Sequence, residues 1–271
     1  MIDVVILNRN LGTVCDDLVA DLDARLSSDS NIVVVDAGSE FELQSQFTTV
    51  RVDTEEVRRD GLRFGRGMNI GIRYIREKLA PNPWVLLLPV DTEIVSWNLI
   101  SLFDQLMAVP EVVALKPLEL SSAYATHLQE NSIALAWNLE EGPWLISTAF
   151  LDEQILLSQN GEFFDHNNYR GYLTSIDIAF RAYSNGYSVG ITNCLTTNEN
   201  ESYLIERAEL IKTDPIDVNA KMLVEEGMQW LGNKYGISDP WAFAQLVRLL
   251  HDRFFDENPE LVSWRLNYDH K

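Results

Sequence analysis

Short apolar runs alternate with segments of helical spacing along the N-terminal third of the chain. The strand-like runs cover residues 3–7, 31–35, 48–52 and 84–88. Residues 15–26 and 65–79 instead repeat apolar side chains every three or four positions, as amphipathic helices do. Strands and helices that alternate over short links are typical of βαβ units. The pattern therefore predicts an α/β fold with a mostly parallel sheet flanked by helices.

The rest of the chain predicts a mixture of strands and helices that becomes helical toward the end. The expected elements are a helix over 97–107, a strand over 112–115, a candidate strand over 133–137 within a long connection, a helix-like run over 144–158, an aromatic loop over 161–172, a helix over 173–183 and a strand over 188–192. The clearest later helix opens with Asp239 as N-cap and Pro240 at its first position. We expect a domain over 1–200 and a helical C-terminal extension over 201–271 that packs on it.

The composition is strongly acidic. Asp and Glu number 41 against 21 Lys and Arg, which gives a net charge of −20 at pH 7. This balance argues against binding to nucleic-acid phosphates or to anionic lipid. Cys15 and Cys194 lack the spacing of a metal site or a disulfide framework, so reduced thiols in a cytoplasmic protein are expected. The N-terminus does not look like a signal peptide, and no apolar run has the length of a membrane span.

The stretch WVLLLPVDTEI at 84–94 places acids directly after a buried strand. Asp91 follows the apolar run by three positions, and Glu93 comes two residues later. Ligands and metals bind at the carboxyl ends of strands in α/β sheets, so Asp91 is a candidate metal ligand that Glu93 could assist. The alternative is structural: Asp91 closes a turn or caps a helix that begins near Ser96.

Several fragments occur in an order that resembles the family 2 glycosyltransferases, which have the GT-A fold. They are VVILNRN, VVVDAGS, GRGMNIGI, LLLPVDTEI, GEFFDHNNYRGYLTSIDIAFRAYSNGYSV and, more weakly, GNKYG. The form LLLPVDTEI looks most like the rhamnosyltransferase-type branch. The resemblance implies an enzyme that transfers a sugar from a nucleotide-diphosphate sugar to a glycan or another hydroxyl acceptor, with inversion at the anomeric centre.

The resemblance also implies roles for individual residues. Asn8 and Asn10 lie in the loop that holds the nucleotide, Asp36 contacts the base, and Asn69 lies beside the donor. Asp91 matches the aspartate that binds a divalent cation, Mn²⁺ or Mg²⁺. The charge of the diphosphate gives an independent reason for a cation in so acidic a protein. Two structural alternatives stay open: Asp36 as a turn residue and Asn69 as an ordinary first-turn helix residue.

The chain departs from the family where the catalytic base is expected. Thr174 and Ser175 occupy the positions of an acidic pair, and neither hydroxyl is a base near neutral pH without an activator. Asp177 is the nearest acid, but it lies about 200° around a helix from Ser175. Asp165, in the aromatic loop, has more freedom to reach an acceptor, and we predict that activity depends more on Asp165 than on Asp177.

Two other classes of protein compete with an active glycosyltransferase. The loss of the acidic pair would suit a pseudoenzyme or nucleotide-sugar-binding module with the same fold. A nucleotidyltransferase would be expected to show a glycine-rich basic loop after the first strand, and NRNLGTVCDD is neither glycine-rich nor basic.

Overall fold

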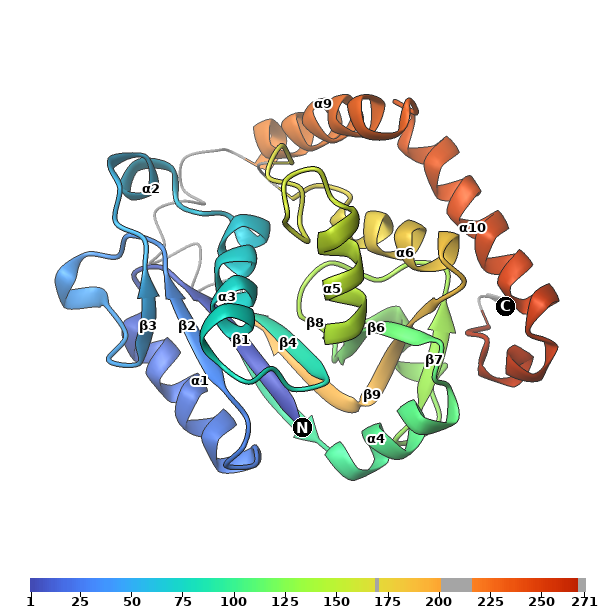
Figure 1. The fold of residues 1–271 in the computed structure, drawn as a ribbon, viewed down its shortest axis with the longest axis horizontal. Helices are drawn as coiled ribbons and strands as arrows, with labels where there is room; N and C mark the ends of the chain where they lie inside the picture. The colour runs from blue at the N-terminus through green and yellow to red at the C-terminus, as the bar shows by residue number, and fades with distance from the viewer. Residues whose placement is uncertain (169–170, 201–215, 268–271) are drawn as a thin grey trace.

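One sheet of nine strands runs through the part of the chain that the computed structural model describes, residues 1–168, 171–200 and 216–267 (Figure 1). Its N-terminal half has the order β3 (Thr48–Arg51), β2 (Ile32–Asp36), β1 (Ile2–Asn8), β4 (Trp84–Pro89). Each neighbouring pair in this half is parallel. The β-branched runs therefore form the parallel strands that the sequence predicts.

The C-terminal half of the sheet mixes both directions. Its order continues from β4 through β8 (Trp144–Ser147), β6 (Val112–Glu119), β9 (Ser188–Glu199) and β5 (Thr92–Trp97), and β7 (Ile133–Ala136) also pairs with β9. Strand β8 is antiparallel to β4 and to β6, whereas β6 and β9 are parallel. Strands β5 and β7 each pair antiparallel with β9. The sheet is thus parallel where it follows βαβ units and mixed beyond them.

Helices flank this sheet. They are α1 (Gly12–Arg25), α2 (Glu55–Asp60), α3 (Phe64–Lys78), α4 (Leu99–Ala108), α5 (Thr148–Leu157), α6 (Thr174–Ser184), α9 (Ile216–Tyr235) and α10 (Pro240–Glu257), with short 3₁₀ turns at Phe41–Leu43, Ala123–Thr126 and Pro259–Trp264. Helix α3 packs closely on β1, because a Cβ at Gly71 would lie 2.2 Å from Val5 Cγ1 and one at Gly67 2.4 Å from Leu7 Cδ1. These two glycines therefore allow helix and strand to approach.

Two predicted helices are present within shifted or narrower bounds. The helix-like run over 144–158 divides into β8 and α5, because its first residues pair with β4 and β6 on either side. The expected helix from residue 97 begins at Leu99, and Asn98 caps it by accepting a hydrogen bond from the Ser101 N–H. The residues before it form β5, so Asp91 does not cap a helix near Ser96.

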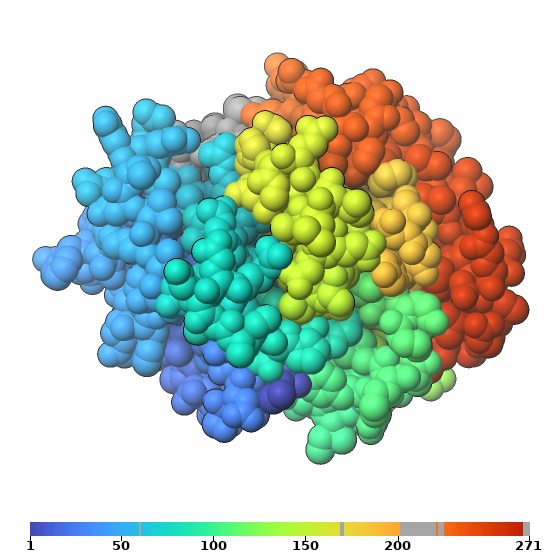
Figure 2. Space-filling model, viewed as in Figure 1, coloured from blue at the N-terminus to red at the C-terminus, as the bar shows by residue number. Residues whose placement is uncertain are grey.

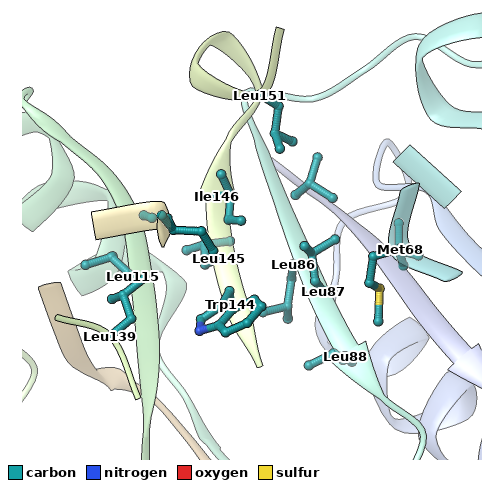
Figure 3. Close-up of a cluster of buried hydrophobic side chains, with 14 of the residues drawn as sticks. Met68, Leu86, Leu87, Leu88, Leu115, Leu139, Trp144, Leu145, Ile146 and Leu151 are labelled. Atoms are coloured by element: carbon teal, nitrogen blue, oxygen red, sulfur yellow. The ribbon is translucent and has the colours of Figure 1, made fainter. Parts of the chain in front are cut away.

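The core lies where β4 and β8 meet. Leu86, Leu87 and Leu88 of β4 face Trp144, Leu145 and Ile146 of β8, and Met68 of α3 lies on the other side of β4 (Figure 3). All of these side chains are buried. The residues that follow β4 are therefore held by a strand that is packed along its whole length.

The C-terminal helices pack on the same core. Phe243, Val247 and Phe254 of α10 are buried in the main hydrophobic cluster. Figures 1 and 2 show α9 and α10 as a continuous rim beside α6 and the loop that precedes it. The expected boundary at residue 200/201 adjoins residues 201–215, which lie outside the described residues. No helix among the described residues is long and apolar enough to cross a membrane.

Candidate functional site

The carboxyl ends of β1 and β2 bring Asn8 and Asp36 side by side. The two residues are register partners, and the Asn8 side-chain amide donates to Asp36 Oδ2 at 3.4 Å. Asp36 is fully buried; its Oδ1 accepts from the Ser39 N–H at 3.0 Å and lies 3.4 Å from Arg51 Nη1. Asp36 therefore organises the turn after β2, as the structural alternative expects, at the strand end where the nucleotide site is predicted.

Asn10 joins the same two loops. It has a positive φ of 56°, a conformation that asparagine tolerates better than most residues. Its N–H donates to Ser39 Oγ at 2.8 Å, and its Oδ1 accepts from the Glu40 N–H at 2.8 Å. The three predicted residues Asn8, Asn10 and Asp36 thus lie in one braced pair of loops.

Asn69 lies away from that pair and holds a different loop. Its amide donates to Phe164 O at 2.8 Å and to Glu162 Oε2 at 3.2 Å, and its Oδ1 accepts from the Phe164 N–H at 3.0 Å. Arg73, one turn further along α3, pairs with the Glu162 carboxylate at 2.8 Å. These bonds occupy both amide hydrogens, so Asn69 ties α3 to the aromatic loop before α6.

Asp91 follows β4 and is only 2% exposed. Its carbonyl accepts from the Asn200 N–H at 3.0 Å, and the adjacent Thr92 is the register partner of Glu199. Desolvation raises the pKa of Glu199 to about 7; the positive charge of Lys116 opposes this rise, and the negative charge of Asp91 adds to it. The end of β4 is therefore a place where negative charge is already crowded.

Lys116 lies behind this crowded end. It is fully buried on β6, and its Nζ lies 3.7 Å from Glu199 Oε1. Desolvation lowers the pKa of Lys116, whereas Glu199 and other nearby carboxylates raise it. Gly142 covers the pair closely, since a Cβ there would lie 2.1 Å from Glu199 Oε1 and 2.3 Å from Lys116 Nζ.

A divalent cation fits this position only if ligands come from outside the protein as well. No group of three or more His, Cys, Asp or Glu that could hold a metal ion occurs in the described residues. Glu93, which the sequence offers as an assisting ligand, is exposed and accepts from the Asn198 amide at 3.3 Å. Asp91 supplies a hard oxygen donor at the strand end, which suits Mn²⁺ or Mg²⁺ when phosphate oxygens complete the shell.

The start of α6 carries a carboxylate from another part of the chain. Ser175 Oγ donates to Glu141 Oε1 at 2.7 Å, and the Ser175 N–H donates to the same oxygen at 3.3 Å. Desolvation raises the pKa of Glu141, and the Ser175 donors and Lys116 oppose that rise. The residue as a whole is exposed, whereas its hydrogen bond to the Ser175 hydroxyl is partly buried. An acid from another part of the chain therefore contacts Ser175 at the start of α6.

Asp177 points into a buried ionic network instead. Arg181 Nε lies 3.0 Å from its Oδ2, Lys234 Nζ lies 2.8 Å from its Oδ1, and the Tyr235 hydroxyl donates to Oδ1. Burial opposes ionisation of Asp177, but Arg181 and Lys234 outweigh it and hold the pKa below its ordinary value. Asp177 and Ser175 thus contact different partners from different faces of the helix, as helical spacing predicts.

Asp165 is also engaged within the chain. Its Oδ2 accepts from Trp230 Nε1 at 3.0 Å, and its Oδ1 accepts from the Asn167 N–H at 2.9 Å. It lines a cavity of about 1060 Å³ between α5, α6 and α9, together with Arg181 and Lys234. The residues at the ends of β1, β2 and β4 do not line this cavity, so Asp165 and the predicted nucleotide loops belong to separate regions.

No protein-family model matches the chain, and no curated protein matches its sequence. Solved structures do match. GalNAc-T7 with UDP, GalNAc and Mn²⁺ has a TM-score of 0.57 at 11% identity, over 96% of this chain and 55% of its own. The Pyrobaculum calidifontis mannosyltransferase PcManGT with GDP-Man and Mn²⁺ has a TM-score of 0.54 at 13% identity, over 97% of this chain and 72% of its own. S. aureus TarS (residues 1–349) with UDP-GlcNAc has a TM-score of 0.54 at 14% identity, over 94% of this chain and 72% of its own.

These similarities define the fold. Identities of 11–14% carry no residue roles, and the chain spans about half the length of GalNAc-T7, of which 55% is covered. The neighbours are GT-A-type glycosyltransferases, and the central sheet flanked by helices matches theirs. The predicted GT-A fold is confirmed.

Three site residues escaped prediction from the sequence: Glu141, Lys116 and Glu199. The only local signal was the pair Glu140-Glu141 before Gly142-Pro143, in the connection between β7 and β8. Ser175 and Glu141 are 34 positions apart, and no periodic pattern links them. Their proximity depends on how β8 and α6 pack.

Proposed function

We propose that the chain is a glycosyltransferase that moves a sugar from a nucleotide-diphosphate sugar to a hydroxyl acceptor. One observation carries the proposal: Asn8 and Asp36 end the neighbouring parallel strands β1 and β2 of a GT-A-type sheet, and Asp91 lies just after β4. Ligands of open α/β sheets bind at this edge. The nucleotides and nucleotide sugars in the neighbouring structures, UDP, GDP-Man and UDP-GlcNAc, support the same class of ligand.

We further propose that Asn8, Asn10 and Asp36 form the nucleotide end of the site. The hydrogen bonds of Asp36 to Ser39 and Asn8, and of Asn10 to Glu40, hold both loops in one shape. Preorganised loops reduce the ordering cost of binding. In this proposal Asn69 acts indirectly, by fixing the loop around Phe164 against α3.

Asp91 would hold the divalent cation. When bound there with a diphosphate, Mn²⁺ or Mg²⁺ would neutralise charge on the leaving group. The net charge of −20 makes such compensation necessary, since the protein otherwise repels a diphosphate. Mn²⁺ accompanies nucleotide ligands in the GalNAc-T7 and PcManGT structures, which supports the same pairing here.

Direct displacement with inversion is the stereochemical course we propose, in line with the resemblance to family 2 and its rhamnosyltransferase-type branch. The second candidate is a binding module of the same fold. Its support is Thr174 and Ser175, which replace the expected acidic pair at the start of α6. The two candidates make the same prediction for nucleotide binding and opposite predictions for turnover.

The experiment is turnover of a donor panel. Wild-type protein is incubated with UDP-, GDP- and dTDP-sugars and Mn²⁺, with a mixture of hydroxyl acceptors and with water alone. Proton NMR follows loss of the donor anomeric signal and the configuration of the product. We expect one nucleotide class to be consumed, with an inverted product. Binding without consumption favours the module, and neither binding nor consumption contradicts the proposal.

A further inference from the structure

An acid takes the place of the missing pair at the start of α6, although it comes from the connection between β7 and β8. Both donors of Ser175 converge on Glu141 Oε1, at 2.7 Å from the hydroxyl and 3.3 Å from the N–H. These are charge-assisted bonds, and they add to the favourable position of a carboxylate at a helix N-terminus. The carboxylate is thereby fixed against α6.

The second oxygen of Glu141 is left for another proton. Among the described residues, Glu141 Oε2 has no hydrogen-bond partner, and the residue is exposed. A carboxylate with one oxygen anchored and the other without a hydrogen-bond partner can accept a proton from a hydroxyl that comes within hydrogen-bond distance. Asp177 lacks this property because it contacts Arg181, Lys234 and Tyr235. Asp165 lacks it because both of its oxygens accept hydrogen bonds.

Glu141 is also connected to the end of β4, where the donor diphosphate is proposed to lie. The next residue, Gly142, lies against Glu199 Oε1 and Lys116 Nζ. Glu199 in turn interacts with Asp91 and pairs with the strand that Asp91 precedes. A continuous set of contacts therefore runs from the Asp91 end to the Ser175 end of the site.

We propose that Glu141 is the general base that takes the proton of the acceptor hydroxyl, and that Ser175 positions it. This inference rests on the proposed glycosyl transfer. The acceptor O–H gives its proton to Glu141 Oε2, and the oxygen uses the freed electron pair to bond the anomeric carbon. The bond from that carbon to the diphosphate oxygen breaks, and the nucleoside diphosphate leaves with the electron pair. Thr174 and Ser175 then need no base function of their own.

The test compares Glu141→Gln with Glu140→Gln, a neighbouring variant that removes the same charge. Steady-state turnover is measured with the donor consumed in the panel, and nucleotide affinity by calorimetry. We expect kcat of Glu141→Gln to fall by about 10²- to 10⁴-fold while nucleotide affinity and thermal midpoint stay within error. Glu140→Gln should keep the wild-type rate, and added formate should restore part of the rate of Glu141→Ala. The kcat of Ser175→Ala should fall by only about tenfold, because the Ser175 N–H still donates to Glu141 Oε1.

Each remaining outcome counts against a different statement. Wild-type turnover with an unchanged rate in Glu141→Gln would overturn the inference and leave the proposed function intact. Equal losses in Glu141→Gln and Glu140→Gln would reduce the effect to surface charge. Wild-type protein that binds nucleotide but consumes no donor would overturn the base role and support the binding module. Wild-type protein that binds no nucleotide would overturn the proposed function.

Discussion

The Asp177→Asn variant should unfold more readily than wild type, because the buried Asp177 carboxylate neutralises the charges of Arg181 and Lys234. Asp177 is 3% exposed, and Arg181 and Lys234 lie 3.0 and 2.8 Å from its oxygens. Removing one partner of a buried ion pair costs about 3–5 kcal/mol, since the other charge stays buried. The side chains of Arg181 and Lys234 are 13% and 26% exposed, so water can solvate part of their charge. We therefore expect about 3 kcal/mol.

The assay is thermal unfolding of wild type, Asp177→Asn and Asp256→Asn, in which the same change is made at an exposed position of α10. For a chain of this size about 3 kcal/mol lowers the midpoint by about 6–12 °C. The pKa of Asp177 is held below its ordinary value of 3.8, so its contribution is present above that value. The gap between wild type and Asp177→Asn should therefore narrow as the pH falls through the folded-state pKa.

Two results would refute this reasoning. A midpoint for Asp177→Asn equal to that of Asp256→Asn would show that the network adds little to stability. An unchanged midpoint together with lost turnover would return Asp177 to catalysis and show that its contacts are not structural.

Three further predictions concern other parts of the molecule. Asp36→Ala should weaken nucleotide binding by about 1–3 kcal/mol in calorimetry, because the loop loses its charge-assisted bonds; unchanged affinity would limit Asp36 to its turn. Gly142→Ala should destabilise the fold more than Gly186→Ala, since both have positive φ but only Gly142 is crowded by other atoms; equal denaturation midpoints would contradict the close contact. His251 is buried, and desolvation, with Arg265, lowers its pKa to about 4 from 6.5. As the pH falls, the unfolded chain therefore binds the proton before the folded protein does. Between pH 6.5 and 4 the free energy of unfolding of wild type should fall by about 3 kcal/mol relative to that of His251→Gln in denaturant titrations. An equal pH dependence of the two proteins would contradict this prediction.

The strands that the sequence predicted well are those whose own residues determine them. The runs at β1, β2 and β4 are mostly apolar or β-branched, and their central residues are buried on both faces of the sheet. The strand β5 was missed because its pairing with β9 joins residues about a hundred positions apart, such as Thr92 and Glu199. The strand Trp144–Ser147 was not distinguished from the helix that follows it, because a short apolar run has no distinctive period.

The candidate site divides in the same way. Asn8, Asp36 and Asp91 lie at the carboxyl ends of strands that were predicted correctly, so their common edge could be predicted too. The partner of Ser175 could not be predicted, because Glu141 reaches it from a connection whose path depends on tertiary packing. The hydrogen bonds of Asp165 depend in the same way on the packing of α9, which supplies Trp230.

The most direct test of the proposed function is metal-dependent nucleotide binding. UDP-, GDP- and dTDP-sugars are titrated calorimetrically into wild type and Asp91→Asn, with and without Mn²⁺. We expect one nucleotide class to bind wild type, and Mn²⁺ to tighten it at least tenfold, or about 1.4 kcal/mol. Asp91→Asn should bind as wild type does without metal and gain nothing from Mn²⁺. Absence of nucleotide binding to the wild type, or an equal gain from Mn²⁺ in both proteins, would contradict the account.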